Sequence, residues 1–116
     1  MNNRNIGKMG ELMALEYLVS AGYTVLAQNH YIDGYEIDLI MEREGEIYFI
    51  EVKYRRNLKY GYPIEAMTRI KCQNFKRACM GYLRMNKITQ KYHLAFLGIL
   101  KIHNSHEIQW VKDFFT

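Results

Sequence analysis

The chain has 116 residues, a length that suits one compact domain and is too short for two domains with separate cores. Hydrophobic residues make up 49% and charged residues 24% of the chain, a composition that is typical of folded proteins and argues against intrinsic disorder. Lysine and arginine outnumber acidic residues by 16 to 12, and this net charge of +4 permits a polyanionic partner without requiring one. We therefore expect a single domain over residues 1–116.

The sequence contains no sign of a membrane or of an oxidising compartment. The most apolar run, Leu94 to Leu100, is far shorter than the roughly 20 residues that a membrane span needs. No apolar stretch follows the first five residues, so we expect no secretory signal. Cys72 and Cys79 lie about two helical turns apart, too far for a disulfide. These features predict a reduced, cytoplasmic protein without membrane contact.

The first half of the chain predicts a helix followed by strands. Residues 6–21 have helical spacing and end before Gly22, a common helix stop. The apolar residues at that spacing are Leu12, Leu15, Leu18 and Val19. A short extended segment follows at residues 23–29. Two strand-like runs come next, at 35–42 and 46–54, and the short gap between them with its glycine predicts a β-hairpin.

The second half of the chain predicts another helix and the rest of a sheet. Residues 59–63 form an expected loop, and residues 68–85 an expected helix with Thr68 as its N-cap. The apolar run at 92–103 predicts a strand buried on both faces, and residues 106–111 a last strand. The order α-β-β-β-α-β-β predicts an α/β fold in which helices flank a mixed sheet.

The predicted hairpin carries acidic residues in both strands. Strand alternation separates the residues of the first strand into two faces, with Glu36 and Asp38 on one and Ile37 and Leu39 on the other. The same rule puts Glu51 and Lys53 on one face of the second strand, with Val52 turned away.

Hairpin register then brings charged residues together. If Glu44 and Gly45 are the two loop residues, Asp38 lies opposite Glu51, and by the same count residue 36 lies opposite residue 53. Directly opposed residues have Cβ atoms about 4.5–5.5 Å apart, so two carboxylates placed in this way repel each other unless something stabilises them. Nearby carboxylate oxygens are the ligands that Mg²⁺ or Mn²⁺ prefers. The pattern therefore predicts a divalent-cation site, provided that the turn has two residues.

Lys53 and Glu11 complete the candidate site. An ammonium near the metal can orient a water or stabilise charge on a phosphate oxygen, as metal-assisted hydrolysis requires. Glu11 lies at helical spacing from Leu15 and Leu18 and so points along the apolar stripe, where a carboxylate is costly unless paired or metal-bound. Taken alone, Glu51 and Lys53 could simply lie on a solvated strand face, and Glu11 could be a glutamate at the edge of the helix. Their combination with Asp38 is what points to catalysis.

Several motifs in order resemble a known family. They are Gly7-x-x-Gly10-Glu11, Glu36-Ile37-Asp38-Leu39-Ile40, Phe49-Ile50-Glu51-Val52-Lys53-x-Arg55, Gly61-x-Pro63-x-Glu65-Ala66, Lys71 and Ile108-x-Trp110-Val111-Lys112-Asp113-x-Phe115. With these spacings, nearly the whole chain closely resembles the YraN-like family of small bacterial proteins. That family is placed in the PD-(D/E)xK nuclease superfamily and is similar in fold to archaeal Holliday-junction resolvases. The chain differs from the family pattern at Tyr35, where a small residue is usual, and at His93, where an aspartate is frequent.

The resemblance implies a restriction-endonuclease-like fold with a metal-dependent phosphodiesterase site on the hairpin. It implies Asp38, Glu51 and Glu11 as metal ligands, Lys53 as the catalytic lysine, and the main-chain carbonyl of Val52 as a further ligand. It also puts Lys71, at the start of the second helix, within reach of the site or of a phosphate. From the register we expect Glu36 as a partner that supports the lysine.

Basic and aromatic residues directly follow the second hairpin strand. Arg55, Arg56 and Lys59 alternate with tyrosines, among them Tyr60. Guanidinium and ammonium groups neutralise phosphates, and tyrosine rings can stack on unpaired bases. This loop therefore predicts contact with nucleic acid, and the resemblance favours DNA.

Together these features predict a Mg²⁺- or Mn²⁺-dependent endonuclease that hydrolyses phosphodiester bonds of DNA, branched or structured DNA included. Resolvases of similar fold act as two-fold dimers, so a homodimer is compatible with this hypothesis. A second hypothesis is a non-catalytic nucleic-acid-binding module with a vestigial nuclease site, and a third is a protein-interaction scaffold whose acidic pocket is structural. Cleavage, salt-sensitive binding without cleavage, or neither would distinguish the three.

Overall fold

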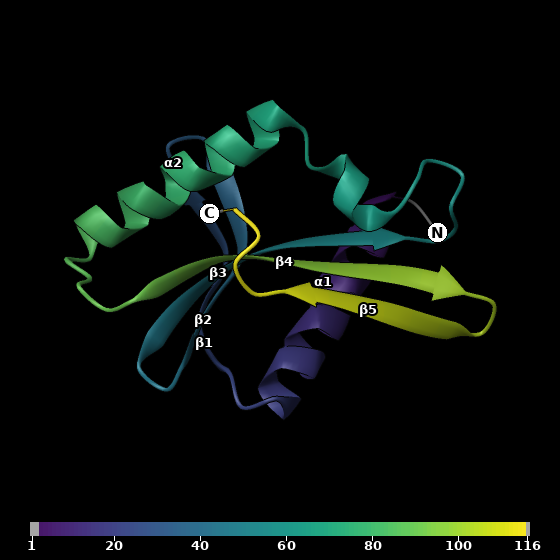
Figure 1. Cartoon of the computed structure of the whole chain (residues 1–116), viewed down its shortest axis with the longest axis horizontal. Coiled ribbons are helices and arrows are strands. Elements are labelled where there is room, and N and C mark those ends of the chain that lie inside the picture. The colour runs from purple at the N-terminus through teal and green to yellow at the C-terminus, as the bar shows by residue number, and fades with distance from the viewer. Residues whose placement is uncertain (1–2, 116) are drawn as a thin grey trace.

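The computed structural model describes residues 3–115, which form two long helices, a short 3₁₀ helix and a five-stranded sheet (Figure 1). The elements in chain order are α1 (Asn3–Ser20), β1 (Thr24–Ile32), β2 (Tyr35–Arg43), β3 (Glu46–Arg55), η1 (Pro63–Ala66), α2 (Arg69–Met85), β4 (Tyr92–Ile102) and β5 (Ser105–Val111). The predicted order α-β-β-β-α-β-β is confirmed. The sequence did not predict η1, and β1 extends to Ile32, three residues beyond the predicted end of that segment at residue 29. No helix in the described range is long and apolar enough to cross a membrane.

The strands lie side by side in the order of the sequence, and the sheet is mixed. Neighbouring strands are antiparallel except for β3 and β4, which are parallel. A parallel pair needs a crossover connection, and α2 supplies it. The predicted N-cap of this helix is confirmed, because the Thr68 side chain accepts a hydrogen bond from the Lys71 backbone N–H.

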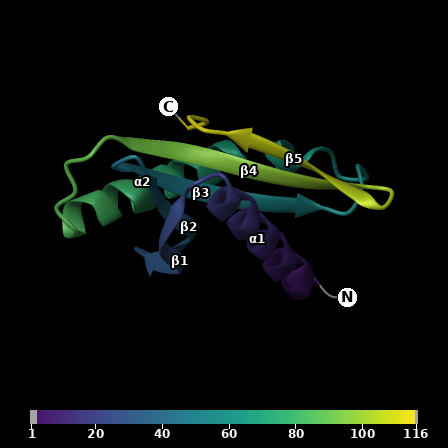
Figure 2. The same ribbon diagram turned by 90° about the horizontal axis from the view of Figure 1, so that it is seen from below.

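The two helices pack on opposite faces of the sheet (Figures 1 and 2). On the α1 face, Ala14 and Leu18 pack in one cluster with Tyr48 and Ile50 of β3. On the α2 face, a second cluster joins side chains of the helix to three strands, namely Phe75, Ala78, Cys79, Ile40, Phe49 and Phe96. Because both faces of the central strands are covered, burial of apolar area stabilises the strands that carry the acidic residues.

The buried stripe of α1 is narrower than its sequence predicts. Leu12 is 55% exposed and Val19 is 51% exposed, so neither belongs to the core. The buried residues are instead Ile6, Gly10, Ala14 and Leu18, four positions apart along one line of the helix. Gly10 and Ala14 are small, and the helix therefore approaches β3 closely.

Gly10 sets how closely α1 approaches β3. A Cβ atom at Gly10 would lie 2.8 Å from the Cβ of Tyr54, a contact that backbone movement must relieve. We expect Gly10→Ala to lower the free energy of unfolding by about 1–3 kcal/mol, because it forces the helix outward. Urea denaturation monitored by circular dichroism measures this change.

Gly7→Ala is the matched control, since Gly7 lies in the same helix and has no atom within 4 Å of the added methyl group. We expect this variant to be as stable as the wild type or more stable by up to about 1 kcal/mol, because alanine favours the helix. Equal effects of the two substitutions would contradict the close packing of α1 on β3.

Candidate active site

The turn of the β2–β3 hairpin has the two residues on which the predicted register depends. Glu44 and Gly45 both have positive φ, at 53° and 79°, as a type I′ turn requires. Arg43 pairs with Glu46, and the ladder continues to Leu39 and Ile50. The predicted register is therefore confirmed over this part of the hairpin.

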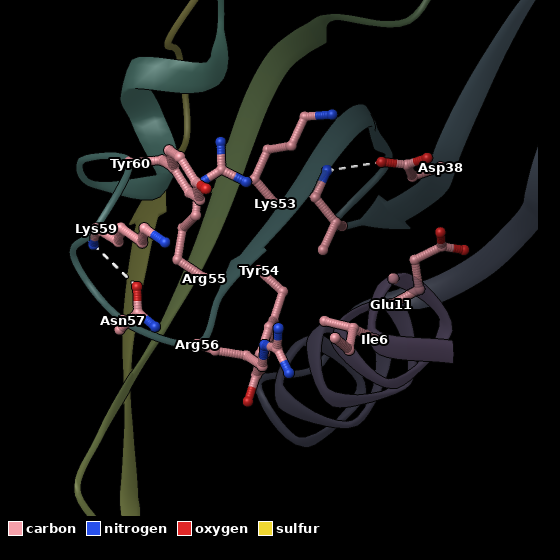
Figure 3. A pocket seen from close by; sticks show the side chains of 12 residues that line it. Ile6, Glu11, Asp38, Lys53, Tyr54, Arg55, Arg56, Asn57, Lys59 and Tyr60 are labelled. Atoms are coloured by element: carbon pink, nitrogen blue, oxygen red, sulfur yellow. Dashed lines mark hydrogen bonds between the residues drawn. The ribbon is translucent and has the colours of Figure 1, made fainter. Parts of the chain in front are cut away.

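The two strands part at Asp38. Their paired residues end at Leu39 and Ile50, and the Val52 N–H donates a hydrogen bond to Oδ2 of Asp38 at 2.8 Å (Figure 3). The Asp38 carboxylate thus accepts the hydrogen bond that a main-chain carbonyl of the neighbouring strand would accept in a regular ladder. The predicted pairing of Asp38 with Glu51, and of residue 36 with residue 53, is wrong because the ladder stops before it reaches these residues.

Strand alternation also fails at this point. Ile37 packs in the cluster on the α2 face and Leu39 in the cluster on the α1 face, although the sequence predicts one shared face. The residue across from Asp38 in β1 is Asn29, which has φ of 48°. Neither residue belongs to the β1–β2 ladder, while the pairs on both sides of them are kept. A local irregularity of both strands therefore turns the acidic side chains toward α1.

Three carboxylates meet on the α1 side of this irregularity. One oxygen each from Glu11, Glu36 and Asp38 lies within 4.8 Å of the others. Glu36 accepts a hydrogen bond from Asn29 and interacts with the Tyr31 hydroxyl. Its support of Lys53 stays a prediction. Asn29 also binds Glu11, and the sequence analysis missed this residue. The sequence feature that could have indicated Asn29 is its place at the end of a predicted extended segment, because asparagine is disfavoured in strands.

Glu51 and Lys53 lie together on β3, as alternation predicts. Glu51 is only 6% exposed, and its Oε1 lies 3.5 Å from Nζ of Lys53. The hydroxyl of Tyr35 donates to Oε2 of Glu51 at 3.0 Å, while the Tyr35 ring packs edge-on against Phe75. The Tyr35 hydroxyl therefore supplies a hydrogen-bond donor to a predicted metal ligand, a contact that the sequence did not predict.

Burial makes the charged forms of these carboxylates costly. It raises the pKa of Asp38 well above its usual value, and the charge of Glu51 adds to the effect, while the Val52 N–H opposes it. Burial likewise raises the pKa of Glu51, against the opposing charge of Lys53. Lys71 also lowers the pKa of Glu51, so its ammonium acts on the site from the first turn of α2.

A pocket of about 650 Å³ opens beside the carboxylates (Figure 3). Figure 3 shows Glu11 and Asp38 on one side of it and Arg55, Lys59 and Tyr60 on the other. The predicted site residues that line the pocket are Glu11, Asp38, Lys53, Arg55, Arg56, Lys59 and Tyr60. Glu36 and Glu51 do not line it but lie close to residues that do, Glu36 to Glu11 and Asp38, and Glu51 to Lys53. Lys71 does not line it either, and its charge acts on Glu51.

Arg55, Lys59 and Tyr60 form a basic and aromatic wall of the pocket. Nε of Arg55 is buried and has no hydrogen-bond partner within residues 3–115. Tyr60 is 75% exposed, and Nζ of Lys59 lies 5.4 Å from the centre of its ring. Guanidinium and ammonium groups on such a wall favour charged acceptors such as phosphate oxygens.

His93, the second departure from the family pattern, lies away from this pocket. Its ring is buried, with Nδ1 2.5 Å from Oδ1 of Asp113 and Nε2 2.5 Å from Oε1 of Glu46, the first residue of β3. The imidazole therefore ties the C-terminal segment to the turn end of the hairpin, whereas the candidate site lies toward the other end of β3.

Comparison with known proteins places the chain in a family. The model of the family described as "Uncharacterised protein family UPF0102" matches residues 10–101. The chain belongs to the UPF0102 family. This is the YraN-like family that the motifs resemble, and the match contains every candidate site residue from Glu11 to Lys71.

Relatives in the UPF0102 family match most of this chain. A UPF0102 protein of Dictyoglomus thermophilum is 38% identical over 111 residues, which cover 95% of this chain and 94% of the relative. One of Carboxydothermus hydrogenoformans is 35% identical, with coverage of 98% and 100%. One of Caldicellulosiruptor saccharolyticus is 40% identical over 87 residues, with coverage of 75% and 74%.

The raised pKa of Asp38 predicts how stability depends on pH without divalent cations. Between the ordinary and the raised pKa, the folded state binds more protons than the unfolded state, so the free energy of unfolding falls as pH rises through this window. We expect Asp38→Asn to remove this loss and to be more stable than the wild type at pH 7, by about 1.4 kcal/mol for each pKa unit of the shift. Urea denaturation in EDTA between pH 4 and 8 measures both curves.

Asp33→Asn is the control, because Asp33 is an exposed aspartate in the β1–β2 turn. We expect its pH curve to run parallel to that of the wild type. If the free energy of unfolding depends on pH in the same way for the wild type and Asp38→Asn, the raised pKa of Asp38 is contradicted.

Proposed function

We propose that this UPF0102 protein is a divalent-cation-dependent endonuclease that hydrolyses phosphodiester bonds of DNA. The observation that carries the proposal is the single pocket in which acidic residues, a lysine and a basic, aromatic loop come together. Acidic residues alone would support a metal site, and basic residues alone would support phosphate binding. Their combination around one space is what hydrolysis of a phosphodiester requires.

The donor set fits Mg²⁺ or Mn²⁺. Both cations prefer oxygen ligands, and ligands at about 2.0–2.1 Å from Mg²⁺ lie about 3–4 Å from one another. The oxygens of Glu11, Glu36 and Asp38 lie within 4.8 Å, so a small inward movement brings them to that spacing. Glu51, whose charge acts on Asp38, and the main-chain carbonyl of Val52 are further candidate ligands. A cation held there would polarise a phosphate oxygen and lower the pKa of a bound water.

Lys53 acts on the reacting groups in this proposal. Its ammonium lies 3.5 Å from Oε1 of Glu51 and lines the pocket, so the carboxylate fixes its position. From there it holds the attacking water and stabilises the negative charge that develops on the phosphate. Tyr35 in turn holds Glu51, and burial raises the pKa of the Tyr35 hydroxyl, which therefore keeps its proton and acts as a donor.

The basic wall binds the substrate on either side of the reacting phosphate. Arg55, Arg56 and Lys59 neutralise backbone phosphates, and the exposed ring of Tyr60 stacks on an unpaired base. Unpaired bases occur in branched and other structured DNA, which are therefore the proposed substrates. A homodimer would allow two strands to be cut symmetrically and stays a prediction.

Cleavage of end-labelled duplex, flapped, four-way and single-stranded DNA tests the proposal. With Mg²⁺ or Mn²⁺ we expect cutting that EDTA abolishes. Lys53→Ala should lower the rate at least about 100-fold, because it removes the group that stabilises the developing charge. Its affinity for Mn²⁺ should stay nearly unchanged, since the carboxylates remain.

Lys91→Ala is the matched control, because Lys91 is an exposed lysine beside Ile47, at the turn end of β3. It should cleave at the wild-type rate. Full activity of Lys53→Ala would contradict the proposed mechanism. Salt-sensitive binding by the wild type without cleavage in any metal would favour the non-catalytic binding module instead.

The proposed phosphate contacts also predict how binding depends on salt. Each contact releases counterions, so Arg56→Ala and Lys59→Ala should each reduce the slope of log K against log salt concentration by about one unit. Arg84→Ala, in the last turn of α2, should leave the slope unchanged. Fluorescence anisotropy of labelled flapped DNA in EDTA, over a series of salt concentrations, measures these slopes. Equal slopes for all four proteins would contradict the assigned loop.

A further inference from the structure

Asn29 contacts two of the clustered carboxylates with one atom. Its Nδ2 lies 2.6 Å from Oε1 of Glu11 in α1 and 2.9 Å from Oε1 of Glu36 in β2. An amide nitrogen carries two N–H groups, and here each has its own carboxylate acceptor. The two glutamates come from different elements, so this single side chain ties the helix to the strand at the site.

The backbone of Asn29 is as unusual as its contacts. Its φ of 48° lies within a β-strand, at the position across from Asp38 where the β1–β2 ladder is interrupted. Asparagine adopts this left-handed conformation more readily than most residues, whereas a β-branched residue would be strained. Glycine also adopts it but has no amide. The position therefore suits a residue that tolerates positive φ and carries hydrogen-bond donors.

A neutral donor suits a site that receives a cation. Two carboxylates held side by side repel each other, and the amide dipole offsets this without adding a charge. A lysine or arginine would oppose a cation by its charge, and an aspartate would add to the repulsion. Asn29 binds one oxygen of each glutamate, and Glu36 also interacts with the Tyr31 hydroxyl. A carboxylate has two oxygens, so these contacts are compatible with metal binding by Glu11 and Glu36.

We propose that Asn29 is a positioning residue, which holds Glu11 and Glu36 beside Asp38 in the arrangement that receives the divalent cation. This inference rests on the proposed function, because it assigns Asn29 a role toward the same metal site. Side chains that orient metal ligands in this way commonly change metal affinity by 10- to 100-fold when they are removed, roughly as ligands do.

Isothermal titration calorimetry of the full chain with MnCl₂ tests the proposal. Asn29→Gly removes the amide and keeps a residue that accepts positive φ, so we expect a folded protein with at least about tenfold weaker Mn²⁺ binding. Lys87→Gly is the matched control, because Lys87 is exposed and also has positive φ, at 51°. It should bind Mn²⁺ with the wild-type affinity.

The outcomes separate this inference from the proposed function. Wild-type affinity in folded Asn29→Gly would overturn the role of Asn29 and leave the metal site in place. Absence of Mn²⁺ binding by the wild type would overturn the metal site itself, and the inference with it.

A second variant covers a failure of Asn29→Gly to fold. Asn29→Asp keeps the size of the side chain and replaces the donors by acceptors, so it adds a negative charge beside two others. We expect it to unfold at a lower temperature than the wild type in EDTA, and saturating Mn²⁺ to raise its unfolding temperature by more degrees than that of the wild type. An equal or smaller rise would overturn the proposal.

Discussion

The hydrogen bond from the Val52 N–H to Asp38 is the contact on which the site depends. It ends the β2–β3 ladder with a carboxylate in place of a main-chain carbonyl, so the strands part without leaving that N–H unpaired. In both ribbon views, β1 and β2 then run at a steep angle to β4 and β5 (Figures 1 and 2). Groups from the two faces of the sheet reach the site where the strands part: Glu11 comes from the α1 face, while Glu51 and Lys71 belong to the α2 side.

The fold supports a group of charges that would be unfavourable on its own. Burial raises the pKa of both Asp38 and Glu51, and neighbouring carboxylates repel each other. Apolar clusters cover both sheet faces beside the site, and Gly10 lets α1 lie close enough to bring Glu11 to the strands. Two neutral donors hold the neighbouring carboxylates: Asn29 binds Glu11 and Glu36, and Tyr35 binds Glu51. Buried charges that repel one another and are held by the packed core around them are typical of functional sites.

The sequence predicted those parts of the molecule that local rules govern. The two-residue turn at Glu44 and Gly45 fixed the hairpin register, and Thr68 marked the start of α2. Most residues of the candidate site were also named from the sequence, because alternation pairs Glu51 with Lys53 and because the motifs resemble those of the UPF0102 family. These predictions depend on near neighbours in the chain and on the order of the motifs.

The features that were missed depend on contacts between distant residues. Alternation failed at Asp38, because no local rule indicates where two strands part or that Asn29 adopts positive φ. Asn29 reaches Glu11 across 18 residues, and Tyr35 reaches Glu51 across 16. The exposure of Leu12 has the same cause, since the line of contact on α1 follows the small residues that β3 can approach.

Anomalous diffraction from crystals of the full chain soaked in Mn²⁺ would test most directly whether this cluster is a divalent-cation site. We predict a strong anomalous peak within bonding distance of Asp38, with at least one of Glu11, Glu36 and Glu51 as a further ligand, and no such peak in crystals of Asp38→Asn. An ordered site without a peak at millimolar Mn²⁺, or a peak of equal height in Asp38→Asn, would contradict the account.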